Sequence, residues 1–136
     1  MHKLRVVFDV NIFVSYIIKD RMRELFDMVF DRGIQLYRND DMRDELAEVL
    51  ARLKFAKYLL APIENYIDFF EKVTVSYSTV AVFKDCTDPK DNYLFDLAYQ
   101  TKSDYLVSGD KKVLTTPVKK SLQVVTLAVF REMVLK

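Results

Sequence analysis

The stretch TDPKDNYLFDLAYQTKSDYLVSGD, residues 87–110, decides the fold of this chain. Asp88 is a good N-cap and Pro89 suits the first position of a helix, so we expect a helix to begin here. The helix leads into the apolar run at residues 105–108, which reads as a short buried strand ending at Gly109 and Asp110. Since a helix here leads directly into a strand, the stretch is the core of a βαβ arrangement.

Asp91 has an unexpected place on this helix. At about 100° per residue its side chain shares the inward face with apolar residues, namely Leu94, Phe95 and Ala98. The opposite, exposed face is expected to carry Asn92, Asp96 and Gln100. A carboxylate aimed at an apolar core is costly unless something cationic meets it, and a metal ion is the expected partner.

Strands and helices alternate along the rest of the chain. We expect strands at residues 3–8, 34–38, 105–108 and 122–125, an extended segment at 75–83, and helices between them. Strands separated by helices indicate βαβ units. The prediction is therefore an α/β fold over residues 1–136, one domain with a mostly parallel sheet of four to five strands and helices on both faces.

The apolar stripes of the helices name the expected core. The stripe of the helix before Gly33 is Met22, Leu25, Phe26, Val29 and Phe30, and Gly33 suits the helix C-terminus. Asn39 is expected to cap the next helix, whose stripe is Met42, Leu46, Val49, Leu50 and Leu53. A turn with a short helical piece is expected at residues 54–61, then a helix from Pro62, and a closing helix at residues 127–134.

Composition excludes several classes of protein. The longest nearly apolar run, residues 12–18, contains Ser15 and is far too short to span a bilayer, and we expect no signal peptide. Cys86 is the single cysteine, which fits a reducing, cytoplasmic location. The net charge of +1 gives no global basic field. Acids gathered in one cleft would nevertheless leave the remaining surface basic.

Four carboxylates from separate segments are expected to meet at one edge of the sheet, where ligands of open α/β sheets bind. Asp9 and Asp110 each follow directly on a predicted strand. Asp91 begins the helix that leads into the Asp110 strand. Glu45 lies roughly 80° from the centre of its apolar stripe, closer than its acidic neighbours.

Such a cluster repels itself and raises its own pKa values unless a cation compensates. Mg²⁺ and Mn²⁺ prefer carboxylate and water oxygens. With His2 as the only histidine, zinc ligation and a catalytic triad are improbable, and there is no glycine-rich phosphate loop. The sequence therefore favours metal-assisted chemistry with water as nucleophile and a phosphoryl group as target.

Each candidate also has an ordinary structural interpretation. Asp9 can simply end a strand, Asn11 or Asp88 can cap a helix, and Glu45 can be a solvated helix acid. Asp91 can stabilise a helix N-terminus, Asp110 can be a turn residue, and Ser108 can be a core hydroxyl. These alternatives stay open at the level of the sequence.

Four segments together give the chain a family resemblance: Phe8-Asp9-Val10-Asn11, Asn39–Leu50 around Glu45, Asp88-Pro89-Lys90-Asp91, and Val107-Ser108-Gly109-Asp110. In this order and spacing they resemble the PIN-domain ribonucleases, in particular the bacterial PIN-domain toxins of toxin–antitoxin pairs. Val10 stands where threonine is common, and Asn39 where serine often caps the helix. Neither departure removes a ligand.

The resemblance implies a parallel sheet between helices and cleavage of single-stranded RNA. It implies that Asp9, Glu45, Asp91 and Asp110 are catalytic and hold Mg²⁺ or Mn²⁺, supported by Asn11, Asp88 and Ser108. For contact with the RNA we expect Lys111 and Lys112, next to Asp110, and also Lys90. An antitoxin protein is a possible partner.

Two other classes of protein compete with the nuclease. A receiver-like or phosphohydrolase domain also gathers aspartates at strand ends, but residues 34–38 lack the following Asp and Val107-Ser108 lacks a lysine. The other alternative is a non-catalytic RNA-binding or protein-docking scaffold. Tyr66, Phe69 and Phe70 on one helix mark either a homodimer or antitoxin surface or a helix buried on two sides.

Overall fold

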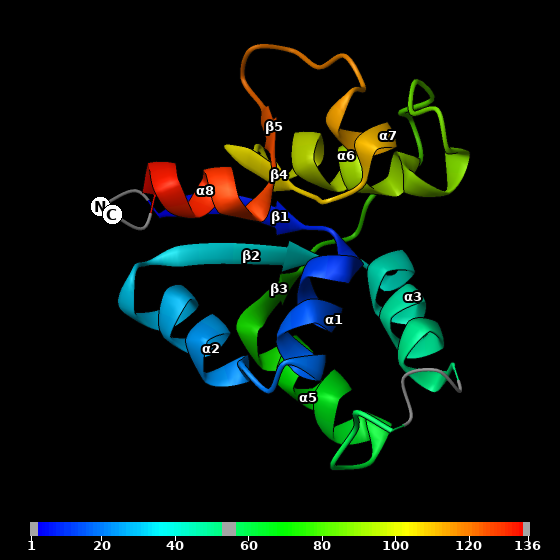
Figure 1. The fold of residues 1–136 in the computed structure, drawn as a ribbon. Helices are drawn as coiled ribbons and strands as arrows, with labels where there is room; N and C mark the ends of the chain where they lie inside the picture. Colours follow the sequence, from blue (N-terminus) through cyan, green and yellow to red (C-terminus); the bar gives the residue numbers. More distant parts are fainter. Residues whose placement is uncertain (1–2, 53–56, 135–136) are drawn as a thin grey trace.

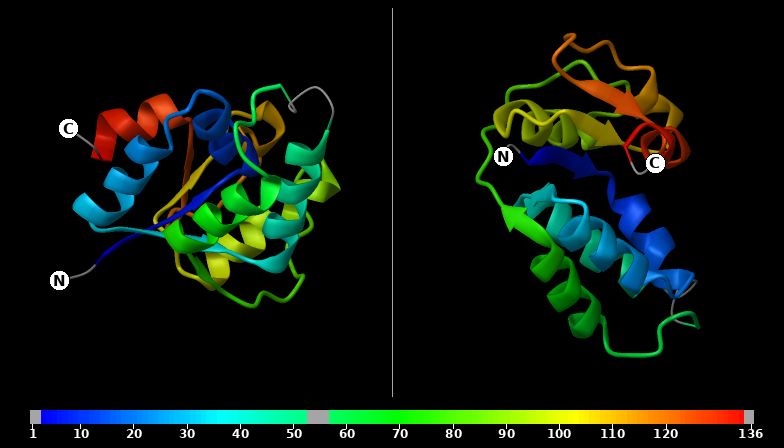
Figure 2. Two further views of the ribbon diagram at one scale, coloured as in Figure 1. Left: turned by 90° about the horizontal axis from the view of Figure 1, so that it is seen from below. Right: turned by 90° about the vertical axis from the view of Figure 1, so that its left-hand side faces the viewer.

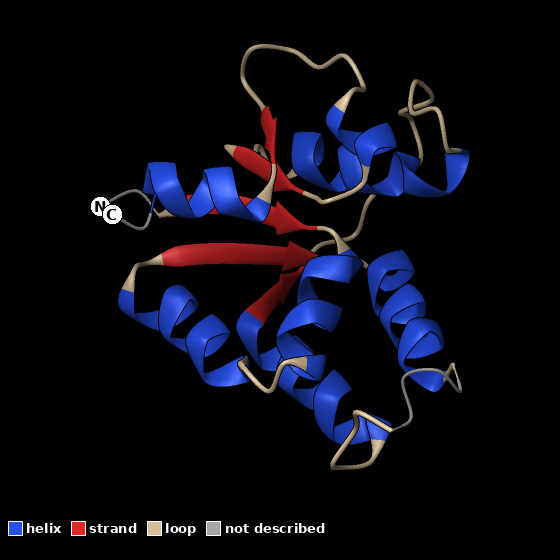
Figure 3. Cartoon of the chain, in the orientation of Figure 1, coloured by secondary structure: helices blue, strands red, loops and turns tan. Residues whose placement is uncertain are grey.

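The computed structural model describes residues 3–52 and 57–134, which contain a five-stranded sheet (Figures 1 and 3). Its strands are β1 (Leu4–Phe8), β2 (Ile34–Arg38), β3 (Thr74–Ser76), β4 (Tyr105–Val107) and β5 (Gln123–Val125). Their spatial order is β3-β2-β1-β4-β5, and every neighbouring pair is parallel. The α/β fold with four to five mostly parallel strands is therefore confirmed, with β1 at the centre.

Helices cover both faces of this sheet. In chain order they are α1 (Val10–Ile18), α2 (Met22–Asp31), α3 (Asp40–Ala51), α5 (Ile63–Val73), the 3₁₀ turn η1 (Pro89–Asp91), α6 (Asn92–Gln100), α7 (Lys111–Leu114) and α8 (Leu127–Val134). Helices α6 and α7 lie over one face, and α1, α2, α5 and α8 lie over the other (Figures 1 and 2). Helix α3 stands beyond the carboxyl ends of the strands and contacts α1, α5 and α6. None of the described helices is long and apolar enough to cross a membrane.

The core lies on both sides of β1. Phe8 has no exposed surface, and its ring contacts Phe13 of α1 and Phe130 of α8 with centroids 5.8 and 5.7 Å apart. Over the other face, Phe95 of α6 stacks on Phe83 with centroids 4.5 Å apart. A central parallel strand is buried on both faces in this way, which explains its continuous apolar sequence.

The expected ends of several helices are present. Asn39 caps α3 by accepting a hydrogen bond from the Met42 amide at 3.0 Å, and Asp88 caps η1 by accepting one from the Lys90 amide at 3.1 Å. Gly33 follows α2 with φ +67°, a conformation that glycine adopts without strain. Leu53 and the first part of the expected turn at residues 54–61 lie outside the described residues.

Two aromatic residues expected in the core are exposed. On α2, Phe26 and Phe30 are 42% and 54% exposed and stack on each other with centroids 4.4 Å apart, so this part of the predicted stripe is wrong. Leu25 is buried as expected, and Met28, which the stripe did not include, is buried as well. The helix packs against the sheet with only one narrow side, so the far side of the wide stripe reaches solvent.

In α5 the aromatic side chains are internal. Tyr66 and Phe70 are buried, and Phe69 is partly buried against the same core. The ordinary interpretation of this aromatic cluster, a helix buried on two sides, is therefore the one that the structure favours. A homodimer draws no support from these rings.

Asp96 is buried rather than exposed. Residues 77–87, which we call the strap, run over the outer side of α6 without regular secondary structure. The Asp96 carboxylate accepts hydrogen bonds from the backbone amides of Val82 and Phe83 at 3.1 and 2.8 Å, and the residue is only 5% exposed. The expectation that Asp96 faces water is wrong because a second layer of chain covers it.

Asn92 and Gln100 bind the same strap, one helical turn to either side of Asp96. The Asn92 side-chain oxygen accepts from the Cys86 amide at 3.0 Å. Gln100 accepts from the Val80 amide at 2.9 Å and donates to the Val80 carbonyl at 2.7 Å. The polar face of α6 thus fixes the chain that leads into the Asp88–Asp91 turn.

Candidate metal centre

The central strands β1 and β4 end side by side. In their parallel register Phe8 pairs with Val107, so Asp9 and Ser108, which come next, emerge at the same edge of the sheet. The Asp9 amide donates to the Val107 carbonyl at 2.8 Å. The Ser108 hydroxyl donates to Asp9 Oδ2 at 2.7 Å. Residues 99 positions apart in sequence are thus held in direct contact.

Asp9 is almost completely buried, with 4% of its surface exposed. Burial is the main cause that raises the pKa of its carboxyl above the ordinary range, and the charge of Asp110 adds to it. The bond from Ser108 offsets part of this rise. Asp9 Oδ1 accepts from the Asn11 amide at 3.4 Å, so Asp9 is the cap of α1. The alternative in which Asn11 caps that helix is therefore wrong, and Asn11 itself is exposed.

Asp110 is half-buried and lies at the start of α7. Its carboxylate accepts from the Lys112 amide at 2.9 Å, and its own amide donates to the Ser108 hydroxyl at 3.0 Å. Ser108 therefore connects Asp9 and Asp110 through one hydroxyl, which donates to the first and accepts from the second. Asp110, for which the ordinary interpretation was a turn residue, is the N-cap of α7 and is linked to Asp9 through Ser108.

Asp91 carries the largest carboxylate pKa shift at this edge. Its side chain is 9% exposed, and burial is the first cause that raises its pKa to about 7. The charges of Asp9, Asp88, Asp110 and Glu45 follow in that order, and each raises the pKa further. An acid whose charged form is opposed from every direction is a site that a cation would stabilise.

Glu45 reaches the same region from α3. The Tyr93 hydroxyl of α6 donates to Glu45 Oε2 at 2.8 Å. The pKa of Glu45 is raised, mainly by burial and also by the charge of Asp9, whereas Tyr93 and Lys90 act in the opposite direction. The structure therefore brings the other three expected carboxylates within electrostatic reach of Asp91.

As they stand, these side chains are not yet a coordination shell. Within residues 3–52 and 57–134, no three acidic, cysteine or histidine side chains are close enough to hold a metal ion together. None of the four carboxylates forms a salt bridge with a described residue, since those salt bridges join Arg23 to Asp27 and Glu71 to Arg38 and Arg43. An all-carboxylate donor set without counter-charge fits Mg²⁺ or Mn²⁺, and it does not fit zinc.

The expected RNA-contacting lysines lie at the surface around these acids. Lys111 and Lys112 are the first two residues of α7, directly after Asp110, and both are exposed. Lys90 is exposed one position before Asp91, and its charge lowers the pKa of Glu45. Asp88, also expected in a supporting part, caps η1 and adds its charge to the field at Asp91.

Tyr93 is the member of this region that sequence reasoning missed. It lies between the inward and outward faces of α6, and its partner Glu45 is 48 positions away in the chain. No pattern in the local sequence marks a tyrosine as the partner of such a distant carboxylate.

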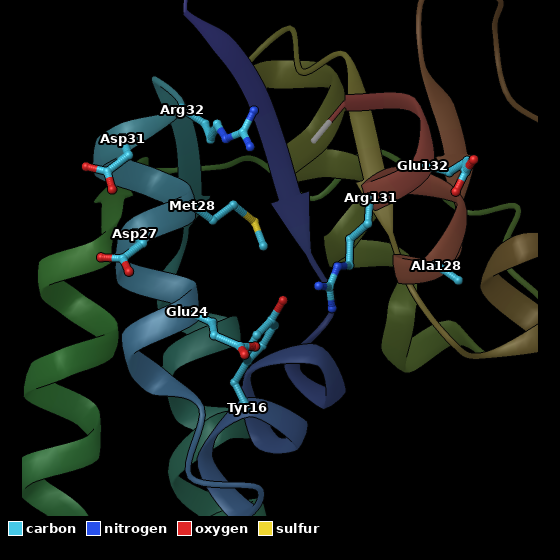
Figure 4. A pocket seen from close by; sticks show the side chains of 9 residues that line it. All are labelled: Tyr16, Glu24, Asp27, Met28, Asp31, Arg32, Ala128, Arg131 and Glu132. Carbon is cyan, nitrogen blue, oxygen red and sulfur yellow. The ribbon is translucent and has the colours of Figure 1, made fainter. Parts of the chain in front are cut away.

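A second acidic hollow lies elsewhere, between α2 and α8 (Figure 4). We call it the α2–α8 groove, and it is lined by Tyr16, Glu24, Asp27, Met28, Asp31, Arg32, Ala128, Arg131 and Glu132. Glu24 and Arg131 point into the same space in Figure 4, whereas the carboxylates of Asp27 and Asp31 point away from it. Asp27 is paired with Arg23 at 3.2 Å. None of the four carboxylates of the candidate metal centre lines this hollow.

The fold and the site define an α/β protein with buried acids gathered at the carboxyl edge of a parallel sheet. The chain belongs to the PIN domain family, whose model matches residues 5–112. PIN domains are generally nucleases that act on RNA and use divalent metals. The chain is 29% identical over 122 residues to an uncharacterized protein of Methanocaldococcus jannaschii, an alignment that covers 83% of this chain and 75% of that protein. No solved structure matches the chain at a significant level.

Proposed function

We propose that this protein is a Mg²⁺- or Mn²⁺-dependent endoribonuclease that hydrolyses phosphodiester bonds of single-stranded RNA. The observation that carries the proposal is the state of Asp91, a nearly buried carboxyl whose pKa is raised to about 7 by burial and by four other acids. At neutral pH such a cluster is relieved either by protonation of Asp91 or by a cation among the acids, and only a cation lets all of them stay charged. Membership of the PIN family disfavours the receiver-like alternative.

In this proposal each acid has a distinct part. Asp9, Asp91 and Asp110 hold the metal, and Ser108 keeps Asp9 oriented through its 2.7 Å hydrogen bond. Glu45 is a further ligand or orients the attacking water and accepts its proton. Asn11 and Asp88 lie beside the site as supporting residues. Lys90, Lys111 and Lys112 bind phosphates of the RNA on either side of the scissile bond.

A bound divalent cation would supply Lewis acidity and neutralise charge on the scissile phosphate. The side chains of this protein contribute the geometry. Because Asp9 is fixed by Ser108 and by the Asn11 amide, it is the most rigid of the acids and the best principal ligand. Asp91 gains most from a bound cation, because burial and the charges of the neighbouring acids all oppose its own charge.

The test is cleavage of assorted single-stranded RNAs with Mg²⁺, Mn²⁺ or a chelator. We expect cleavage with either metal and none with the chelator. Asp9→Asn should lower the rate by at least about 10³-fold, since metal stabilisation of the transition state is worth several kcal/mol and each 1.36 kcal/mol is tenfold.

The matched control is Asp31→Asn in the α2–α8 groove, which should cleave at the wild-type rate. Circular dichroism should report the same fold for both variants. Substantial cleavage by Asp9→Asn in Mg²⁺ would refute the assignment of this residue.

A specific observation also keeps the non-catalytic alternative in view, namely that no three metal-binding side chains of the described residues are close enough to hold an ion. In that case the protein would bind RNA through its lysines and cleave nothing. Tight RNA binding with no cleavage in either metal would favour the scaffold over the nuclease.

We further propose that the protein is the toxin of a toxin–antitoxin pair that acts in the cytoplasm. Expression in a bacterial host should then arrest growth, and Asp9→Asn should relieve the arrest. Growth unaffected by the wild-type protein would count against this role. A homodimer is a separate proposal, and sedimentation as a strict monomer at micromolar concentration would remove it.

A further inference from the structure

The hydrogen bond between Tyr93 and Glu45 joins two helices across the candidate metal centre. A carboxylate only accepts, so the phenol is the donor in this 2.8 Å bond to Glu45 Oε2. Glu45 belongs to α3, which does not lie directly on the sheet, and Tyr93 belongs to α6, which does. The bond therefore ties Glu45 to the rigid part of the fold.

Without this bond Glu45 has no described partner that would fix its carboxylate. Three rotatable side-chain bonds separate that carboxylate from the backbone of α3, and glutamate loses much rotamer freedom when it is held in one position. The neighbouring charge of Asp9 favours rotamers that turn Glu45 away from the centre. Tyr93 holds Oε2 against that repulsion. Oε1 accepts no hydrogen bond from the part of the chain that the structure describes, so it can meet a cation or a water.

The same device appears at the opposite side of the centre. Ser108 donates to Asp9 Oδ2 at 2.7 Å, so one oxygen of Asp9 is likewise occupied by a neutral hydroxyl. Donors of this kind orient the residues that ligate metals and set how strongly the metal is held. The two hydroxyls also stabilise carboxylates without adding a positive charge that would compete with the cation.

We infer that Tyr93 is a positioning residue, which holds Glu45 in the orientation that the metal-dependent reaction requires. The inference rests on the proposed nuclease function. Tyr93 takes no part in bond breaking, and its effect reaches the reaction only through Glu45.

Tyr93→Phe removes the hydroxyl and keeps the ring. We expect Mn²⁺ affinity, measured by calorimetry on the metal-free protein, to fall about 10-fold or more, and kcat for RNA cleavage to fall by about 10- to 100-fold. KM for RNA should stay within about twofold, because the variant keeps the ring and loses only the hydroxyl that acts on Glu45.

The matched control is Tyr99→Phe on the same helix. Its hydroxyl also takes part in a hydrogen bond, which it accepts from the Lys119 amide at 3.0 Å and which does not involve Glu45. This variant should bind Mn²⁺ and cleave RNA as the wild type does.

A double-mutant cycle separates positioning from mere packing. In a Glu45→Gln background, Tyr93→Phe should cause no further loss of Mn²⁺ affinity or kcat. An equal loss in both backgrounds, or a Tyr93→Phe protein that binds and cleaves like the wild type, overturns the inference and leaves the nuclease proposal standing. A wild-type protein that neither binds Mn²⁺ nor cleaves RNA overturns the proposed function and this inference with it.

Discussion

Two regions of this molecule are rich in acids, and they solve the same electrostatic problem differently. The α2–α8 groove has Glu24, Asp27 and Asp31 along one helix, but Arg32 and Arg131 share the space with them. Asp27 and Arg23 form an exposed i, i+4 pair. At the candidate metal centre the acids are more deeply buried and form no salt bridge with a described residue.

The difference teaches that the number of acids is a poor guide to chemistry. Exposed acids next to arginines cost little, and their pairs contribute little stability. Buried acids without a salt-bridge partner raise one another's pKa, as at Asp91, and the cost of their charges is relieved either by protonation or by a bound cation. Three experiments test whether that contrast is real, in order of decreasing expected effect.

The first compares stabilisation by metal. At 100 times the dissociation constant, Mn²⁺ should stabilise the wild type by about 2.7 kcal/mol, which for a chain of this size raises Tm by about 10 °C. Asp9→Asn should lose most of that rise, whereas Asp31→Asn in the groove should keep it. Thermal unfolding with and without Mn²⁺ measures this. An equal rise of Tm in both variants would show that the two acidic regions do not differ in metal binding.

The second compares the pH dependence of stability without metal. The pKa of Asp91 is raised in the folded protein, so below about pH 4 its carboxyl is protonated in both the folded and the unfolded state. The stability that this protonation gives the folded state is lost as the pH rises through about 7. Three pKa units correspond to about 4 kcal/mol, and coupling among the acids should reduce the measured effect to about 2 kcal/mol.

Asp91→Asn should therefore gain about 2 kcal/mol relative to the wild type between about pH 4 and pH 8, measured by urea unfolding in chelator. Asp31→Asn should show no comparable gain. A constant difference between Asp91→Asn and the wild type across this range would contradict the account of Asp91.

The third compares cationic surfaces. Replacing both Lys111 and Lys112 with glutamine should reduce the salt slope of single-stranded RNA binding by about 1.4, because each phosphate contact contributes about 0.7. Arg131→Gln in the groove should leave that slope unchanged. Fluorescence anisotropy at several salt concentrations measures it, and an unchanged slope in the lysine variant would exclude these residues from the RNA path.

Much of the fold could be predicted because its central strands, β1 and β4, are largely buried. A continuous apolar run such as Val6, Val7 and Phe8 is typical of a buried central strand. Asp9 directly follows β1, and Ser108 directly follows β4. The approach of Asp9 to Ser108 follows from the parallel register alone.

The outer faces of helices were predicted less well, for two opposite reasons. Phe26 and Phe30 are apolar but exposed, because α2 buries only one narrow side. Asp96 is charged but buried, because the strap crosses the side of α6 that faces away from the sheet. A helical wheel identifies the one side of a helix that faces the core. It cannot show that another segment of the chain, such as the strap, covers the opposite side.

Within the candidate site, the acids could be predicted but their neighbours could not. A strand end or a helix start fixes where Asp9, Asp91 and Asp110 emerge. The partner of Glu45 depends on how α3 and α6 approach each other, which is a tertiary contact between residues 48 positions apart.

The strap has a consequence for variation at the molecular surface. Three side chains of α6 form hydrogen bonds with backbone atoms of the strap, namely those of Asn92, Asp96 and Gln100. These bonds do not depend on which side chains the strap carries. Val80 and Val82 point outward and are 69% and 65% exposed. Those two positions can therefore accept almost any residue that the backbone tolerates. Substitutions there would change the surface next to α6 without changing the hydrogen bonds that hold the strap.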